Sequence, residues 1–125
     1  MDLNMEVLIV DDFATMRRIL KNILTQIGFS NLYEASDGKN ALQVLKNQKI
    51  DLIMCDWNMP VMTGLDLLNA VRGDDELKSI PFVMVTAEAQ KENIIQAVQA
   101  GVNNYVVKPF TTETITQKLE KVFGS

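Results

Sequence analysis

Four short apolar runs, each followed at once by a polar residue, constrain this chain more than any other feature. They cover residues 7–10, 52–55, 82–85 and 105–107. A continuous apolar run of this length is typical of a strand buried on both faces, as in a parallel sheet covered by helices. A weaker fifth strand is predicted at 31–35. Because X–Pro segments resist helix formation, the Asn58–Pro60 stretch is expected to be a loop.

Between these runs, apolar residues recur at helical spacing, which predicts five amphipathic helices. Gly28 is expected to end the first helix and Thr111 to cap the last. The apolar residues that mark these helices are Met16, Ile19, Leu20, Ile23, Leu24 and Ile27; Ala41, Leu42 and Leu45; Leu65, Leu68 and Val71; Ile94, Ile95 and Val98; and Ile115, Leu119, Val122 and Phe123, of which the last group is expected to form a buried stripe. Strands that alternate with helices predict a doubly wound α/β fold of (βα)5 type. The flavodoxin-like strand order 2-1-3-4-5 is favoured.

Charged and hydroxyl side chains stand where the predicted strands end. They are Asp11, Asp12, Asp56, Thr86 and Lys108. The carboxyl ends of parallel strands meet at one edge of a sheet, so we expect these side chains to lie together. Three carboxylates repel one another unless a cation binds there, and Mg²⁺ prefers such oxygen ligands. The lysine indicates that an anion is also held, which points to a magnesium-dependent phosphoryl site. Taken alone, the Asp11–Asp12 pair is as consistent with a helix cap.

The composition excludes several classes of function. The 125 residues fit one domain, and a net charge of −4 argues against a nucleic-acid surface. The chain has no histidine, which excludes Ser-His and Cys-His catalysis, and its apolar runs fall short of the roughly 20 residues of a membrane helix. The single cysteine, Cys55, fits a reducing cytoplasm and is expected to be an inert, packed thiol.

Four motifs together resemble the receiver domain of bacterial response regulators, and within that family the stand-alone chemotaxis type. They are Val-Asp-Asp at 10–12, Asp-Trp-Asn-Met-Pro at 56–60, Val-Thr-Ala-Glu-Ala at 85–89 and Tyr-Val-Val-Lys-Pro-Phe at 105–110. Their order, spacing and strand positions all agree, and the resemblance extends over nearly the whole chain. A single receiver domain over 1–125, without an output domain, is therefore expected. Thr63 departs from the pattern, because an acidic residue often precedes the glycine at this point.

The resemblance implies a phosphoacceptor rather than an enzyme. Asp56 would take a phosphoryl group from the phosphohistidine of a histidine kinase, and Lys108 and Thr86 would contact the phosphoryl oxygens. The expected Mg²⁺ ligands are Asp11, Asp12, Asp56 and the backbone carbonyl of Asn58. Asn58 and Glu88 would set how long the phosphoryl group lasts, with a dedicated phosphatase as a further partner. Lys108–Pro109 is a candidate cis peptide bond.

The resemblance also implies how the signal leaves the site. Thr86 would move toward the phosphoryl group, and Tyr105 would turn inward to fill the space behind it. The surface that changes is expected to include Lys91, Ile94, Tyr105, Val107 and Lys118. The implied partner is the flagellar motor switch, reached by a cytoplasmic monomer.

Three alternatives share parts of this pattern. A flavodoxin-type electron carrier needs a neutral phosphate-binding loop after the first strand, where this chain has Asp11-Asp12-Phe13. A haloacid-dehalogenase-type phosphatase usually has a second aspartate two residues after the nucleophile, where this chain has Asn58. A receiver that serves as a phosphate sink or phosphorelay intermediate is the strongest alternative.

Overall fold

A computed structural model describes residues 1–87 and 90–124, and over these residues five strands alternate with five helices. In chain order the elements are β1 (Glu6–Val10), α1 (Ala14–Ile27), β2 (Asn31–Ala35), α2 (Gly38–Asn47), β3 (Leu52–Cys55), α3 (Gly64–Arg72), β4 (Phe82–Thr86), α4 (Lys91–Gln99), β5 (Asn104–Val107) and α5 (Thr112–Phe123). No helix among the described residues is long and apolar enough to cross a bilayer.

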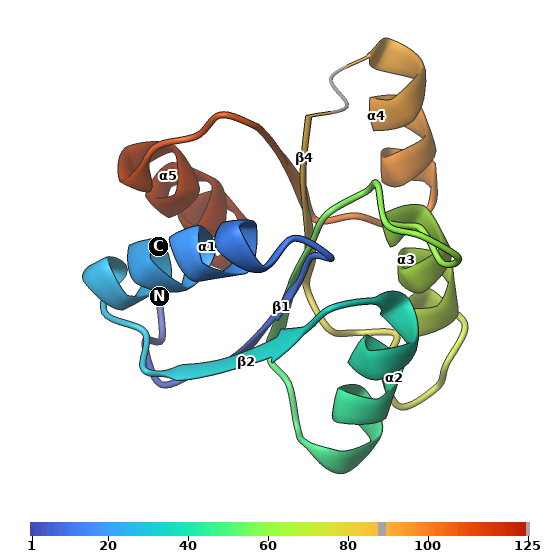
Figure 1. The fold of residues 1–125 in the computed structure, drawn as a ribbon, viewed down its shortest axis with the longest axis horizontal. Coiled ribbons are helices and arrows are strands. Elements are labelled where there is room, and N and C mark those ends of the chain that lie inside the picture. Colours follow the sequence, from blue (N-terminus) through green and yellow to red (C-terminus); the bar gives the residue numbers. More distant parts are fainter. Residues whose placement is uncertain (88–89, 125) are drawn as a thin grey trace.

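The strands form one parallel sheet in the order β2-β1-β3-β4-β5, which confirms the predicted topology. β3 lies in the middle, between β1 and β4, so the chain's acidic strand ends are neighbours. Helices α1 and α5 cover one face of the sheet, and α2, α3 and α4 cover the other (Figure 1).

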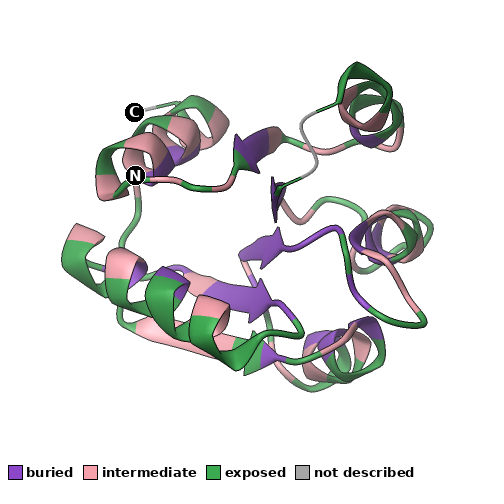
Figure 2. Cartoon of the chain, turned by 45° about the horizontal axis from the view of Figure 1, so that its top comes forward, coloured by how far each residue is buried: buried purple, intermediate pink, exposed green. Residues whose placement is uncertain are grey.

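Each face of the sheet has its own apolar core because successive strand residues point to opposite faces. On β1, Val7 and Ile9 join the core beneath α1 and α5, whereas Leu8 and Val10 join the core beneath α2, α3 and α4. Figure 2 shows the buried residues concentrated on the strands and on the inward faces of the helices. A sheet packed on both sides holds its strand ends rigidly, which is the requirement for a preorganised site.

Side-chain caps fix where several helices begin. The predicted Thr111 cap of α5 is confirmed, because its hydroxyl accepts from the Thr114 amide at 3.1 Å. Thr63 caps α3 in a reciprocal capping box with Asp66, in which each side chain accepts from the other residue's amide. The residue that departs from the family pattern therefore has a defined structural role. Gly28 ends α1 with a φ of 125°, as its predicted position requires.

The apolar residues that mark α4 are not its buried ones. Of the described residues of this helix, the buried one is Ala97, whereas Ile95 is 43% exposed and Val98 62% exposed. Ile94 is only partly buried. Ala97 shares a core cluster with the buried ring of Tyr105. Ile19 of α1 is likewise exposed.

Candidate functional site

The acidic residues are held in place by backbone hydrogen bonds that extend the sheet one residue past its strands. The Asp11 amide donates to the Ala35 carbonyl at 3.2 Å, and the Asp56 amide donates to the Val10 carbonyl at 2.9 Å. Both residues lie just past the ends of β1 and β3, and the sheet-like geometry continues into the site. Neither carboxylate position depends on a loose loop.

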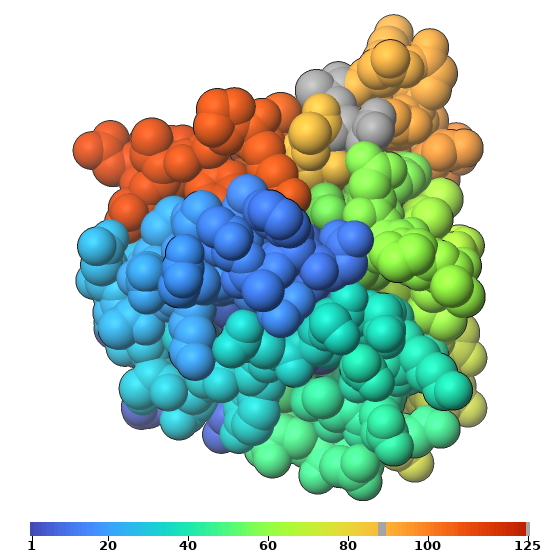
Figure 3. All heavy atoms as spheres, in the orientation of Figure 1, coloured from blue at the N-terminus to red at the C-terminus, as the bar shows by residue number. Residues whose placement is uncertain are grey.

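Three carboxylates converge at this edge of the sheet, as predicted. Asp11, Asp12 and Asp56 each offer one oxygen, and these oxygens lie within 4.8 Å of one another. Asp11 and Asp56 are buried, at 2% and 7% exposure, whereas Asp12 is exposed. In Figure 3 the blue start of α1 adjoins the green segment after β3 and the orange-red segment after β5 on one face of the molecule.

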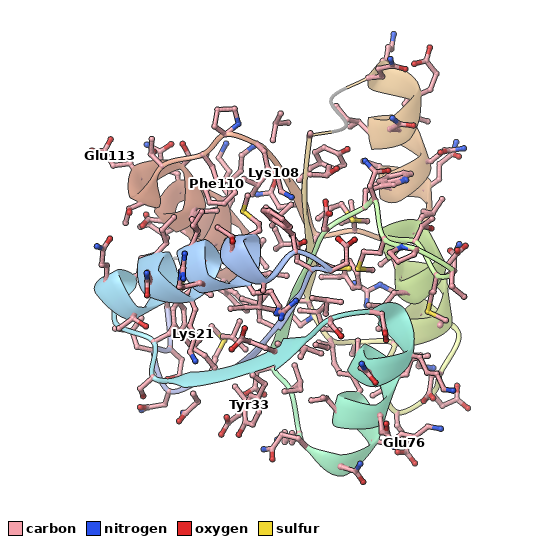
Figure 4. All side chains as sticks on the ribbon, in the orientation of Figure 1. Lys21, Tyr33, Glu76, Lys108, Phe110 and Glu113 are labelled. Carbon is pink, nitrogen blue, oxygen red and sulfur yellow. The ribbon has the colours of Figure 1, made fainter. Side chains whose placement is uncertain are left out.

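Lys108 neutralises part of this negative charge. Its Nζ atom lies 3.3 Å from Asp11 Oδ2 and 3.4 Å from Asp56 Oδ1. Figure 4 shows Lys108 at the end of β5, between the α5 side of the sheet and β4. The Lys108 amide donates to the Thr86 carbonyl at 2.9 Å, which ties it to the neighbouring strand end. The Lys108–Pro109 peptide bond is cis.

The two buried carboxylates also accept local backbone hydrogen bonds. Asp11 Oδ1 accepts from the Phe13 amide at 2.9 Å, and Asp56 Oδ1 accepts from the Trp57 amide at 2.9 Å. Phe13 itself is the N-cap residue of α1, and its side chain makes no capping hydrogen bond. The alternative in which Asp11 and Asp12 are merely helix caps is therefore not what the structure shows.

Burial raises the pKa of Asp56 above its ordinary value, with Asp11 adding to the rise and Lys108 opposing it. Burial also raises the pKa of Cys55 well above its usual range, with Asp56 and Asp11 contributing further. A buried thiol that is held protonated is unreactive, which confirms the expectation for Cys55. Both shifts have burial as their largest cause, so burial disfavours negative charge at this edge of the sheet.

The donor set fits Mg²⁺. It consists of hard carboxylate oxygens, two of them buried and one open to solvent, and Mg²⁺ binds through one or two carboxylates while keeping several waters. The exposed Asp12 side leaves room for those waters and for a phosphate oxygen. Asn58 is exposed in the loop that follows Asp56.

The remaining predicted residues belong to β4, α4, β5 and α5. Thr86 is fully buried at the end of β4, and Tyr105 is buried at 8% exposure. Lys91 and Val107 are exposed, whereas Ile94 and Lys118 are partly buried. The buried Tyr105 is not itself available to a partner in this conformation. Glu88 lies outside the described residues.

Sequence reasoning missed two residues that shape the site. The Gly64 amide donates to the Trp57 carbonyl at 2.8 Å, and a Cβ at Gly64 would collide with the Asp56 carbonyl oxygen. Only glycine lets α3 begin this close to Asp56. Arg17 of α1 donates to the Asp11 carbonyl at 2.7 Å. In the sequence, Arg17 belongs to the polar face of the predicted helix, and nothing in that pattern indicates its contact with the Asp11 carbonyl.

Comparisons with known proteins agree with this geometry. The family described as response regulator receiver domain matches residues 7–120. The chain is 58% identical to chemotaxis protein CheY-3 of Vibrio cholerae over 96% of its own length and 92% of that protein. It is also 58% identical to chemotaxis protein CheY of Pseudomonas aeruginosa, over 95% of its own length and 96% of that protein.

Solved structures show the same fold. The Vibrio cholerae chemotaxis protein CheY4 superposes with a TM-score of 0.88 at 34% identity, covering 95% of this chain and 98% of that one. A receiver domain of a sensor histidine kinase from Pseudomonas aeruginosa superposes with a TM-score of 0.86 at 26% identity, covering 98% of this chain and 99% of that one. That second structure has a magnesium ion coordinated in its active-site cleft.

Proposed function

Because this chain belongs to the response regulator receiver family and is a chemotaxis response regulator phosphorylated on an aspartate, we propose that Asp56 is the phosphoacceptor. The observation that carries the assignment is the strand order. Asp56 follows the central strand β3, with Asp11 and Asp12 on the β1 side and Thr86 and Lys108 on the β4 and β5 side. A phosphoryl group on Asp56 therefore stands between the magnesium ligands and the lysine.

The acidic cluster Asp11, Asp12 and Asp56 is the magnesium site typical of receiver domains. We propose that Asp12 and Asp56 bind the ion directly, that Asp11 does so through water, and that the Asn58 carbonyl completes the protein ligands. The bound ion supplies charge neutralisation at the phosphoryl oxygens. Lys108 offers a second cation, 3.4 Å from Asp56 before any phosphoryl group is present.

The transfer itself needs positioning more than acid–base catalysis. An Asp56 carboxylate oxygen attacks phosphorus, the phosphorus–nitrogen bond of the kinase phosphohistidine breaks, and the histidine nitrogen leaves with the electron pair. The product is an acyl phosphate, which water later hydrolyses to the carboxylate and inorganic phosphate. The chain is thus a signalling phosphoacceptor rather than a conventional enzyme. We propose that Asn58 and Glu88 set the lifetime of the acyl phosphate, with a dedicated phosphatase assisting.

The partners are those of chemotaxis, in general terms a kinase and the motor. We propose that the output is binding to the flagellar motor switch by a cytoplasmic monomer. The Thr86 hydroxyl moves toward the phosphoryl oxygens, and the inward position of Tyr105 becomes fixed. The surface of Lys91, Ile94, Tyr105, Val107 and Lys118 then changes as a two-state population shift.

A peptide from the motor switch protein tests this output. Its affinity for the chain is measured with Mg²⁺ alone and with Mg²⁺ plus beryllofluoride, a phosphoryl mimic, and Asp56→Asn is the matched control. Tighter binding with the mimic in the wild type alone supports motor control. Equal binding in both states, or none, would favour the phosphate-sink alternative.

A further inference from the structure

Arg17 connects the magnesium site to the edge of the sheet. Its side chain is only 18% exposed. Nη1 donates to the Asp11 backbone carbonyl at 2.7 Å, and Nε donates to Glu34 Oε1 at 3.2 Å. Glu34 lies on β2, paired with Ile9 of β1, and also binds Lys21 at 3.4 Å. Figure 4 shows Lys21 on the side of α1 that faces β2. One guanidinium therefore bridges a rigid strand and the backbone that joins the two aspartates.

We propose that Arg17 is a positioning residue for magnesium binding, acting through the Asp11–Asp12 peptide. The Asp11 carbonyl and the Asp12 amide belong to one planar unit, so holding the carbonyl oxygen sets the direction in which Asp12 leaves the sheet. Asp12 is exposed, and its side chain gains no order from burial. The inference rests on the proposed role of Asp12 as a direct ligand.

Among the described residues, the other hydrogen bonds and ion pairs of this segment act on Asp11 and not on the peptide unit that leads into Asp12. The Asp11 amide binds the Ala35 carbonyl at 3.2 Å, and the Asp11 carboxylate binds the Phe13 amide and Lys108. These contacts fix Asp11 itself. The Arg17 bond, at 2.7 Å, acts on the carbonyl that leads into Asp12.

A planar fork suits this task better than an ammonium group. Arg17 reaches the Asp11 carbonyl with one nitrogen and Glu34 with another, and the fork fixes the angle between the two bonds. A lysine at this position donates from a single nitrogen atom, so it does not fix the angle between the two acceptors. The planar shape of the Arg17 guanidinium, and not its charge alone, therefore accounts for the two hydrogen bonds.

The sign of the effect separates positioning from simple electrostatics. Arg17 is a cation close to a cation-binding site, so through-space repulsion alone predicts that its removal tightens Mg²⁺ binding. Loss of positioning predicts the opposite. Residues that orient metal ligands typically change metal affinity by about 10–100-fold.

Mg²⁺ titration of the whole chain tests the proposal, followed by Trp57 fluorescence and independently by calorimetry. The variants are Arg17→Met and Arg17→Lys. The matched controls are Arg18→Met, which removes the same charge from the next, exposed position, and Lys21→Met, which removes only the second partner of Glu34. We expect about 10-fold weaker Mg²⁺ binding for Arg17→Met, a smaller loss for Arg17→Lys, and unchanged or slightly tighter binding for both controls.

Thermal unfolding without Mg²⁺ is measured in parallel. A purely structural role would lower the melting temperature of Arg17→Met while leaving its Mg²⁺ affinity unchanged, and that result would overturn the proposal, as would tighter binding. If Arg17→Met does not fold, the Mg²⁺ affinity and the melting temperature of Arg17→Lys are judged by the same criteria. A wild-type chain that binds no Mg²⁺ would refute the proposed magnesium site as well, so the two failures are distinguishable.

Discussion

Arg72, at the end of α3, should be the most costly single side chain to remove from the surface of this fold. Its guanidinium donates to three backbone carbonyls, those of Gly101 at 3.0 Å, Lys78 at 3.1 Å and Ile80 at 2.7 Å. A fourth bond reaches Asn103 Oδ1 at 2.9 Å. These acceptors come from the loop before β4 and from the turn between α4 and β5. Arg72 thus joins the connection before β4 to the connection before β5.

The expected cost of Arg72→Met follows from these bonds. A hydrogen bond to a charged donor contributes about 1.5–3 kcal/mol when buried. Arg72 is partly exposed, so water will replace much of this, although burial still lowers the pKa of its guanidinium. We expect a loss of about 2–4 kcal/mol of unfolding free energy. For a domain of this size that corresponds to a fall of about 8–15 °C in Tm.

Urea unfolding without Mg²⁺, followed by far-ultraviolet circular dichroism, measures the loss, with Arg18→Met as the exposed control. Asn103 Oδ1 also accepts from the Phe82 amide at 2.8 Å, so Asn103→Ala alone removes more than its bond to Arg72. A double-mutant cycle between Arg72→Met and Asn103→Ala separates the energy of the bond that the two side chains share. We expect a coupling of about 0.5–1.5 kcal/mol. A loss for Arg72→Met no larger than that of Arg18→Met would refute the reasoning.

Two further substitutions should stabilise the protein. Val61 is fully exposed and has a φ of 68°, a left-handed conformation that is costly for a β-branched residue, so Val61→Asn should raise the unfolding free energy by about 1 kcal/mol in urea titrations; an unchanged or lower value would contradict this. Asp56→Asn should stabilise the metal-free protein at neutral pH. Burial raises the pKa of Asp56, so the folded state binds a proton more readily than the unfolded state and loses stability as pH rises through that pKa. The difference in melting temperature between Asp56→Asn and the wild type should therefore shrink as the pH is lowered. A difference that grows on acidification would contradict this prediction.

The sheet, and the edge of it that holds the candidate site, could be predicted because they depend on local sequence patterns. Continuous apolar runs identify strands buried on both faces, and the polar residue that ends each run must then lie at the common edge. Asp11, Asp56 and Lys108 were found in this way, and the structure brings them within ion-pair distance.

The failures involve side chains whose role depends on a distant neighbour. On α4, Ala97 joins the core cluster while Ile95 and Val98 are exposed, and the helix's own apolar spacing does not reveal this. Arg17 and Arg72 look like solvated charges in the sequence. Their carbonyl acceptors lie on other segments, up to 29 residues away for the Arg72–Gly101 bond, and no local pattern encodes such a contact.

The central claim is that Asp56 accepts the phosphoryl group between a magnesium ion and Lys108. The most direct test is phosphoryl incorporation from a small phosphodonor, with the modified residue located by mass spectrometry. We use Asp75→Asn as the control, because Asp75 is an exposed carboxylate far from the site in sequence. The account predicts incorporation at Asp56 that requires Mg²⁺, is unchanged in Asp75→Asn and is lost in Asp56→Asn. Incorporation at the wild-type level in Asp56→Asn, or without Mg²⁺, would contradict it.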